Sequence, residues 1–144
     1  MKKYLPIYGL ESPRLFKLIM FNYLFSNGDA RFKNFSIIET GMGDFRLSPA
    51  YDLLNSRLHI NDSDFALEDG LLPAQLSNGN IARRFHTLGE QAGLNTKSIT
   101  SIFNTMLSNS EKVERLVNAS FLNDHSKRSY LQAYQTRLRR LAKV

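Results

Sequence analysis

The sequence predicts a mainly α-helical domain with one small β-hairpin near its start. Apolar residues recur at three- and four-residue spacing over residues 12–24 and again over residues 80–143, as in helices with one buried face. Between them, a glycine-rich turn separates two short β-type runs within residues 35–48. The length of 144 residues and the apolar content of 42% suit one domain with its own core.

The first helix is expected to open at Ser12 and Pro13, because serine is a good N-cap and proline is a good first helical residue. Its apolar face comprises Leu15, Phe16, Ile19, Met20, Tyr23 and Leu24. Asn27 and Gly28 follow and tolerate left-handed backbone conformations. We therefore expect the helix to stop at these two residues.

A β-hairpin is expected over residues 35–48. Its strands are residues 35–38 and 45–47, which are rich in β-branched and aromatic side chains. The segment 40–44 between them contains two glycines and is expected to form the turn. Residues 55–79 mix polar residues and glycine with few apolar ones, which predicts a long irregular segment.

Four further helices are expected to form a helical bundle over residues 80–143. The first begins at Asn80 and is closed by Gly93, and the second spans residues 96–109. The third presents an apolar face of Val113, Leu116, Val117 and Phe121. Asp124 is expected to cap the last helix, whose apolar face holds Tyr130, Leu131, Tyr134, Leu138 and Leu141.

The composition excludes several classes of protein. The chain has no cysteine, which rules out a disulfide scaffold, a cysteine zinc site and a thiol nucleophile. Its three histidines are far apart and lack the paired spacing of a zinc site. The longest uncharged apolar run, residues 18–25, has about half the length of a membrane span. With no signal-peptide pattern at its start, the chain is expected to be soluble and cytoplasmic, without a membrane partner.

Positive charge is concentrated at the C-terminal end. The net charge is +6, and residues 111–144 hold eight Lys or Arg against three Asp or Glu. Two interpretations of Arg137, Arg139 and Arg140 are open. They form a solvated helix face, or they contact DNA or an acidic partner and release counterions on binding.

Residues 26–34, with the sequence SNGDARFKN, carry the densest set of chemically useful groups. Asp29 and Asn34 stand five positions apart on a loop that leads into the first strand. Asp52 follows the second strand. Because a hairpin returns its end beside its start, we expect Asp52 to lie near Asn34.

Two carboxylates and a carboxamide suit phosphoryl transfer. In that reaction one carboxylate orients and deprotonates the attacking hydroxyl, and a hard pair of oxygen ligands holds Mg²⁺ against the nucleotide phosphates. The Asp-x-x-x-x-Asn spacing of Asp29 and Asn34 equals that of the protein-kinase catalytic loop. Lys33 is placed to neutralise charge on the transferred group.

A purely structural interpretation of the same residues is also open. Asp29 would begin a capped turn, and Asn34 would be a strand-entry residue. Asp52 would act as the N-cap of a helical turn at Leu53 and Leu54.

The segments FSNGDARFKNFS (25–36) and FRLSPAYDLL (45–54) resemble the catalytic core of the HipA-like serine/threonine kinases, the toxin kinases of bacterial toxin–antitoxin modules. The family pattern is roughly N-x-D-x-H-x-K-N-F-S, a hairpin, and L-x-P-x-Y-D. The resemblance extends to the chain's last helix. It implies that residues 1–144 form the helical C-lobe of a protein-kinase-like fold.

The resemblance also implies roles for individual residues. Asp29 would be the catalytic base of the loop 26–34, and Lys33 would belong to the same catalytic loop. Asn34 and Asp52 would bind Mg²⁺ and, through it, the nucleotide. Arg31 departs from the family pattern, which usually has a histidine at that position.

The implied activity is transfer of the γ-phosphoryl group of ATP to Ser or Thr of a protein substrate. Complete kinases of this family also have an N-terminal lobe with a phosphate-covering loop and a nucleotide-binding lysine, and nothing before Pro13 is long enough to hold these. We therefore expect ATP and Mg²⁺ to bind only with an N-lobe from the same gene product or a partner chain. The alternative is a non-catalytic, truncated binding module that contacts an antitoxin or DNA.

Overall fold

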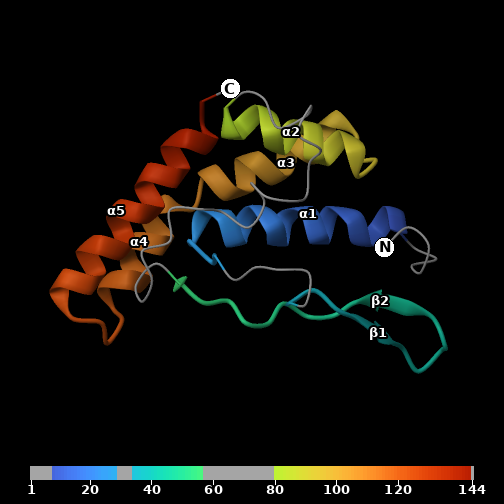
Figure 1. The fold of residues 1–144 in the computed structure, drawn as a ribbon, viewed down its shortest axis with the longest axis horizontal. Helices are drawn as coiled ribbons and strands as arrows, with labels where there is room; N and C mark the ends of the chain where they lie inside the picture. Colours follow the sequence, from blue (N-terminus) through green and yellow to red (C-terminus); the bar gives the residue numbers. More distant parts are fainter. Residues whose placement is uncertain (1–7, 29–33, 57–79, 144) are drawn as a thin grey trace.

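The computed structural model describes residues 8–28, 34–56 and 80–143. This part of the chain is mainly helical with a single two-stranded antiparallel sheet, which confirms the predicted fold class. In chain order the elements are α1 (Tyr8–Leu24), β1 (Ile37–Glu39), β2 (Phe45–Leu47), α2 (Ile81–Gln91), α3 (Thr96–Leu107), α4 (Ser110–Asn118) and α5 (Asp124–Leu141). Figure 1 shows α2 and α3 on one side of α1, the hairpin on the other, and α5 across the C-terminal end of α1.

Helix α1 begins four residues before Ser12, so the expected N-cap at Ser12 is wrong and Pro13 lies inside the helix. A proline this close to the start removes one intrahelical hydrogen bond, that to the carbonyl of the exposed Gly9. A tertiary contact holds the added turn, because the Tyr8 hydroxyl donates to the Ala92 carbonyl at 2.9 Å. Propensity at Ser12 and Pro13 is thus overridden by packing of the preceding turn.

A Schellman motif ends α1. The Ser26 N–H donates to the Tyr23 carbonyl at 3.2 Å, and the Asn27 N–H donates to the Asn22 carbonyl at 3.0 Å. Ser26 has a φ of 56°, a left-handed conformation that glycine usually supplies at this position. The left-handed residue is therefore Ser26 rather than Asn27 or Gly28.

The core is built around α1. Phe16, Met20 and Leu24 are almost fully buried on its inner face. The other helices contribute buried residues that pack against them: Phe85, Ile99, Phe103, Val113, Val117, Tyr134 and Leu141. The Phe16 and Phe85 rings meet edge to face with centroids 6.2 Å apart, a favoured geometry for aromatic pairs.

Asparagine side chains begin three of the four later helices. Asn80, Asn95 and Asn123 each accept a hydrogen bond from the backbone N–H three residues later. The cap of α5 is therefore Asn123 rather than Asp124, which is the first helical residue.

Across the described ranges, no helix has the length and apolar character that a membrane crossing requires.

Gly93 has its expected place at the end of α2, whereas Phe121 does not lie on a buried helical face. Gly93 closes α2 as predicted, with a φ of 79° and with the Leu94 N–H donating to the Gly89 carbonyl. Phe121 was assigned to a buried helical face, and this is wrong. Helix α4 ends at Asn118, so Phe121 lies in the turn before α5 and is fully exposed.

The hairpin is formed by β1 and β2, with Ile38 opposite Arg46. Strand β1 begins two residues later than expected, at Ile37. The turn is closed by a hydrogen bond from the Gly43 N–H to the Thr40 carbonyl, and Gly43 has a φ of 79° that favours glycine. Most of the irregular segment expected at 55–79 lies outside the described residues.

Candidate functional site

Asn34 and Asp52 lie side by side where the chain enters and leaves the hairpin. The Asn34 Nδ2 donates to the Asp52 Oδ2 at 2.9 Å. Both residues are accessible, because Asp52 is exposed and Asn34 is half-buried. The expected proximity of the two side chains is confirmed, and it brings together an amide and a carboxylate, whose oxygens Mg²⁺ prefers as ligands.

Hydrogen bonds at the base of the hairpin produce this proximity. The Ser48 N–H donates to the Ser36 carbonyl at 2.9 Å, one step beyond the β1–β2 ladder. The Ser36 hydroxyl is also hydrogen-bonded to the hydroxyls of Ser48 and Tyr51, both at 3.1 Å. The two strand ends are therefore held together, and the residues that flank them meet.

The backbone of Asp52 is left-handed, with a φ of 53°. This conformation is unfavourable by about 1–2 kcal/mol for a non-glycine residue, although aspartate tolerates it better than most. The buried Asn27 holds it in place, because its Nδ2 donates to the Asp52 carbonyl at 2.9 Å. The interpretation of Asp52 as an N-cap is wrong, since no helix begins at Leu53 or Leu54 and an N-cap is normally extended.

A second group of hydrogen bonds fastens the segment after Asp52 to the end of α1. The Ser26 carbonyl accepts from both the N–H and the hydroxyl of Ser56, at 3.1 and 3.0 Å. The Gly28 N–H donates in turn to the Ser56 hydroxyl at 2.8 Å. Gly28 and Asn34 are thus both held against the segment 52–56.

Three residues singled out from the sequence lie outside the described part of the chain. These are Asp29, Arg31 and Lys33. The sequence-based roles of Asp29 as a base and of Lys33 as a charge-neutralising group stay predictions. The described residues fix the two ends of the loop that carries them.

Glu11 is a positioning residue that sequence reasoning missed. Its carboxylate is 1% exposed and accepts from the Leu47 N–H of β2 at 3.2 Å. The other carboxylate oxygen pairs with Arg14 at 3.2 Å. A buried charge is tolerated only when it is paired in this way, so the contact ties the hairpin to α1. The i,i+3 spacing of Glu11 and Arg14 was the available signal, but it is equally typical of a surface pair.

Arg137 was expected on a solvated or partner-binding face, and the structure corrects this. The residue is 7% exposed, and its guanidinium donates to the Tyr23 carbonyl at 2.9 Å. The guanidinium carbon lies 5.1 Å from the centroid of the Tyr23 ring, within the range of a cation–π contact. Arg137 therefore places a cation at the negative end of the α1 dipole, just before the predicted catalytic loop. Arg139 and Arg140 are exposed as expected.

Two tyrosines of α5 lie behind the Asp52 segment. Burial raises the pKa of Tyr130, and a hydrogen bond from the Asn55 side chain partly offsets that shift. Burial also raises the pKa of Tyr134, and the neighbouring Tyr130 adds to it. Both phenols are therefore neutral at physiological pH.

Comparison with known proteins bears directly on this arrangement. The family model for the HipA-like C-terminal domain matches residues 8–114. This chain belongs to the HipA-like C-terminal domain family. A Haemophilus influenzae protein named "Putative kinase" is 28% identical over 144 aligned residues, which cover 89% of this chain and 41% of that protein. The chain thus spans about two fifths of the length of the curated relative it matches.

The matched region contains α1, the hairpin, the Asn34–Asp52 pair, α2 and α3. Helix α5 lies beyond it. The groups proposed for chemistry thus belong to the HipA-like domain, whereas the basic C-terminal end is outside the matched region.

Proposed function

We propose that this HipA-like domain is the C-terminal lobe of a kinase that transfers the γ-phosphoryl group of ATP to a Ser or Thr hydroxyl of a protein. The contact between Asn34 and Asp52 carries the proposal. It lies at the base of the hairpin, beside a loop whose sequence has kinase spacing, in a chain of this family.

The donor set fits Mg²⁺. Neighbouring oxygen ligands of an octahedral Mg²⁺, each about 2.0–2.1 Å from the ion, lie about 2.9 Å apart. The Asn34 Nδ2 and the Asp52 Oδ2 are separated by 2.9 Å. Exchange of the amide nitrogen and oxygen of Asn34 by rotation of the side chain would present two oxygens at that spacing. Bound there, Mg²⁺ would supply charge neutralisation for the nucleotide phosphates.

The remaining roles follow from the loop sequence. Asp29 is proposed to orient the attacking hydroxyl and accept its proton. Lys33 is proposed to stabilise negative charge on the transferred group. ATP is proposed to bind between this lobe and a second one, because positioning provides most of the catalysis in phosphoryl transfer.

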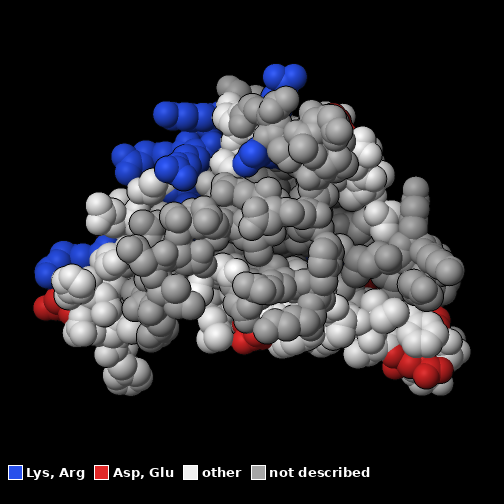
Figure 2. All heavy atoms as spheres, viewed as in Figure 1, with Lys and Arg blue, Asp and Glu red and all other residues white. Residues whose placement is uncertain are grey.

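A second candidate function, a binding module that contacts DNA or an antitoxin, is favoured by one observation. Figure 2 shows lysine and arginine side chains gathered where α5 ends and α2 begins. These two helices pack against each other. The described lysines and arginines at these two helix ends are Arg83, Arg84, Arg139, Arg140 and Lys143, and we call them the basic face. Its positive charge suits a phosphate backbone or an acidic protein.

Labelled ATP tests the proposed kinase function. A polypeptide of residues 1–144, incubated with γ-labelled ATP, Mg²⁺ and a generic protein substrate, should transfer no phosphate. Fusion to the part of the Haemophilus influenzae relative that this chain does not cover should produce labelling, and Asp29→Ala should abolish it. Asp29-dependent labelling by the lobe alone contradicts the need for a second lobe, and a fused, folded protein that never labels contradicts the kinase proposal.

A further inference from the structure

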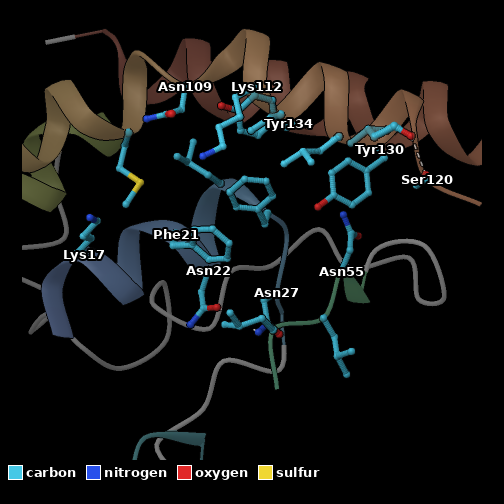
Figure 3. Close-up of a pocket in the computed structure, with 18 of the residues that line it drawn as sticks. Lys17, Phe21, Asn22, Asn27, Asn55, Asn109, Lys112, Ser120, Tyr130 and Tyr134 are labelled. Atoms are coloured by element: carbon cyan, nitrogen blue, oxygen red, sulfur yellow. Dashed lines mark hydrogen bonds between the residues drawn. The ribbon is translucent and has the colours of Figure 1, made fainter. Parts of the chain in front are cut away.

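A pocket of about 570 Å³ lies behind the Asp52 segment, and phosphoryl transfer assigns it no role. It is bounded by α1, α3, α4, α5 and residues 53–55, as the close-up in Figure 3 shows. Its volume falls within the range of about 300–1,000 Å³ that is typical of small-molecule sites. The pocket is therefore large enough for a compact organic ligand.

The walls of the pocket are mainly apolar. They include Phe21, Phe25, Met106, Val113 and Val117. The Phe25 ring stacks on Tyr134 with centroids 5.2 Å apart, which makes one wall flat and aromatic. Such a wall favours a ligand whose body is apolar and aromatic.

The charged side chains among the described lining residues are all positive. Lys17 of α1 and Lys112 of α4 line the pocket, and the described lining residues include no carboxylate. Figure 3 shows the two lysines on different helices that border the same pocket. Their ammonium groups favour a ligand that carries an anionic group.

We propose that this pocket binds a small amphiphilic acid with an aromatic body and one anionic group. The site adjoins the support of Asp52, because Asn27 bonds the Asp52 carbonyl and Leu53 is both a lining residue and the next residue in the chain. Ligand binding should therefore alter the surroundings of Asp52. Neither statement rests on the proposed kinase function, since both are measured without turnover.

A fluorescent probe with these two features tests the site on the 144-residue chain. Anilinonaphthalene sulfonate has two aromatic groups and a sulfonate, and phenylnaphthylamine is its analogue without the sulfonate. The sulfonate should bind with a stoichiometry of one and at least about fivefold more tightly than the neutral analogue. Equal affinity for the two dyes, or no saturable binding, overturns the proposal.

Exposed lysines can be substituted without changing the core, so they provide pairs of variants with equal loss of charge. Lys17→Ala with Lys112→Ala should weaken sulfonate binding about fivefold and leave binding of the neutral analogue unchanged. Lys97→Ala with Lys143→Ala removes the same charge from residues that do not line the pocket, and it should change neither affinity. An equal loss in both double variants would show only non-specific attraction and overturn the assignment.

Backbone amide NMR locates the bound probe. The amides of Asn27, Asp52 and Asn55 should shift on addition of the sulfonate, in proportion to occupancy. The exposed apolar side chains of the hairpin, such as Met42 at 92% exposure, are the competing place for such a dye to adsorb. Shifts concentrated around Met42 with Asp52 unmoved would overturn the proposed site.

Discussion

Arg137 and Asn27 are buried polar residues that support the segments flanking the predicted catalytic loop. Arg137 holds the last turn of α1 through the Tyr23 carbonyl, and Asn27 holds the Asp52 backbone in its left-handed conformation. Both side chains are buried. Because a buried polar group that loses its partner is costly, we expect substitutions at either position to change the site as well as the stability.

Substitution of Arg137 tests whether its buried hydrogen bond stabilises the fold. Arg137→Ala should lower the free energy of unfolding by about 2–3 kcal/mol, because it removes a charged hydrogen bond and the contact with the Tyr23 ring. Arg137→Lys should lose less, since the charge stays but the planar guanidinium does not. Urea denaturation measures both. The exposed Arg139→Ala is the matched control and should change stability by less than about 0.5 kcal/mol; equal effects at the two positions would contradict the role of Arg137.

The hairpin is the element whose placement followed most directly from the sequence. Its turn residues and short β-type strands were sufficient to bring Asn34 beside Asp52, because a two-stranded hairpin leaves one arrangement for its ends. Its attachment was not predictable. Glu11 reaches the Leu47 N–H only through tertiary packing, and nothing in local spacing distinguishes that contact from a surface ion pair.

The boundaries of the helices were likewise only partly predictable from local sequence. The start of α1 depends on the long-range bond between Tyr8 and Ala92, which overrides the strong local signal at Ser12 and Pro13. Phe121 looked like a core residue because it continues the apolar spacing of α4, yet the helix ends before it. In the first case a tertiary contact supports a helix that begins before the local start signal, and in the second the apolar spacing continues past the end of the helix.

Helix α5 carries a prediction of its own through the basic face. If this surface binds duplex DNA with about five phosphate contacts, the logarithm of the affinity should fall with the logarithm of salt with a slope near −4.5. Arg139→Ala with Arg140→Ala should reduce the magnitude of that slope by about 2. Gel retardation across a salt series measures it. A flat salt response, or no retardation at low salt, would identify these arginines as a solvated helix face.

The whole molecule combines a helical core with a site at its edge. The predicted fold class holds because the periodicity of residues 80–143 is strong and each later helix has a polar residue at its start. The buried polar contacts that shape the site, at Glu11, Asn27 and Arg137, were beyond prediction. Each joins segments far apart in the chain, and side-chain type alone does not show which backbone group a polar atom will meet.

Stability at alkaline pH tests the packing of α5 against the rest of the molecule. Burial raises the pKa of Tyr130 and Tyr134 in the folded state above the ordinary tyrosine value of 10.0. The folded protein therefore keeps protons that the unfolded chain loses, so stability is unaffected below about pH 10 and falls as pH rises through the folded pKa values. Urea denaturation from pH 8 to 11 should show a steeper fall in the wild type than in Tyr130→Phe with Tyr134→Phe. Parallel curves would contradict the burial of these phenols.

Nucleotide affinity, measured beside turnover in the fused two-lobe protein, is the most direct test of the proposed catalytic lobe. Calorimetry with a non-hydrolysable ATP analogue and Mg²⁺ gives the affinity, and phosphate transfer gives the turnover. Asp52→Ala should lose both, and Asn34→Ala should lose both to a smaller extent, because a neutral carbonyl is the weaker ligand. Asp29→Ala should lose turnover while nucleotide affinity stays nearly unchanged, since a base contributes only in the transition state. Loss of nucleotide affinity in Asp29→Ala with full affinity in Asp52→Ala would contradict the proposed roles of the two aspartates.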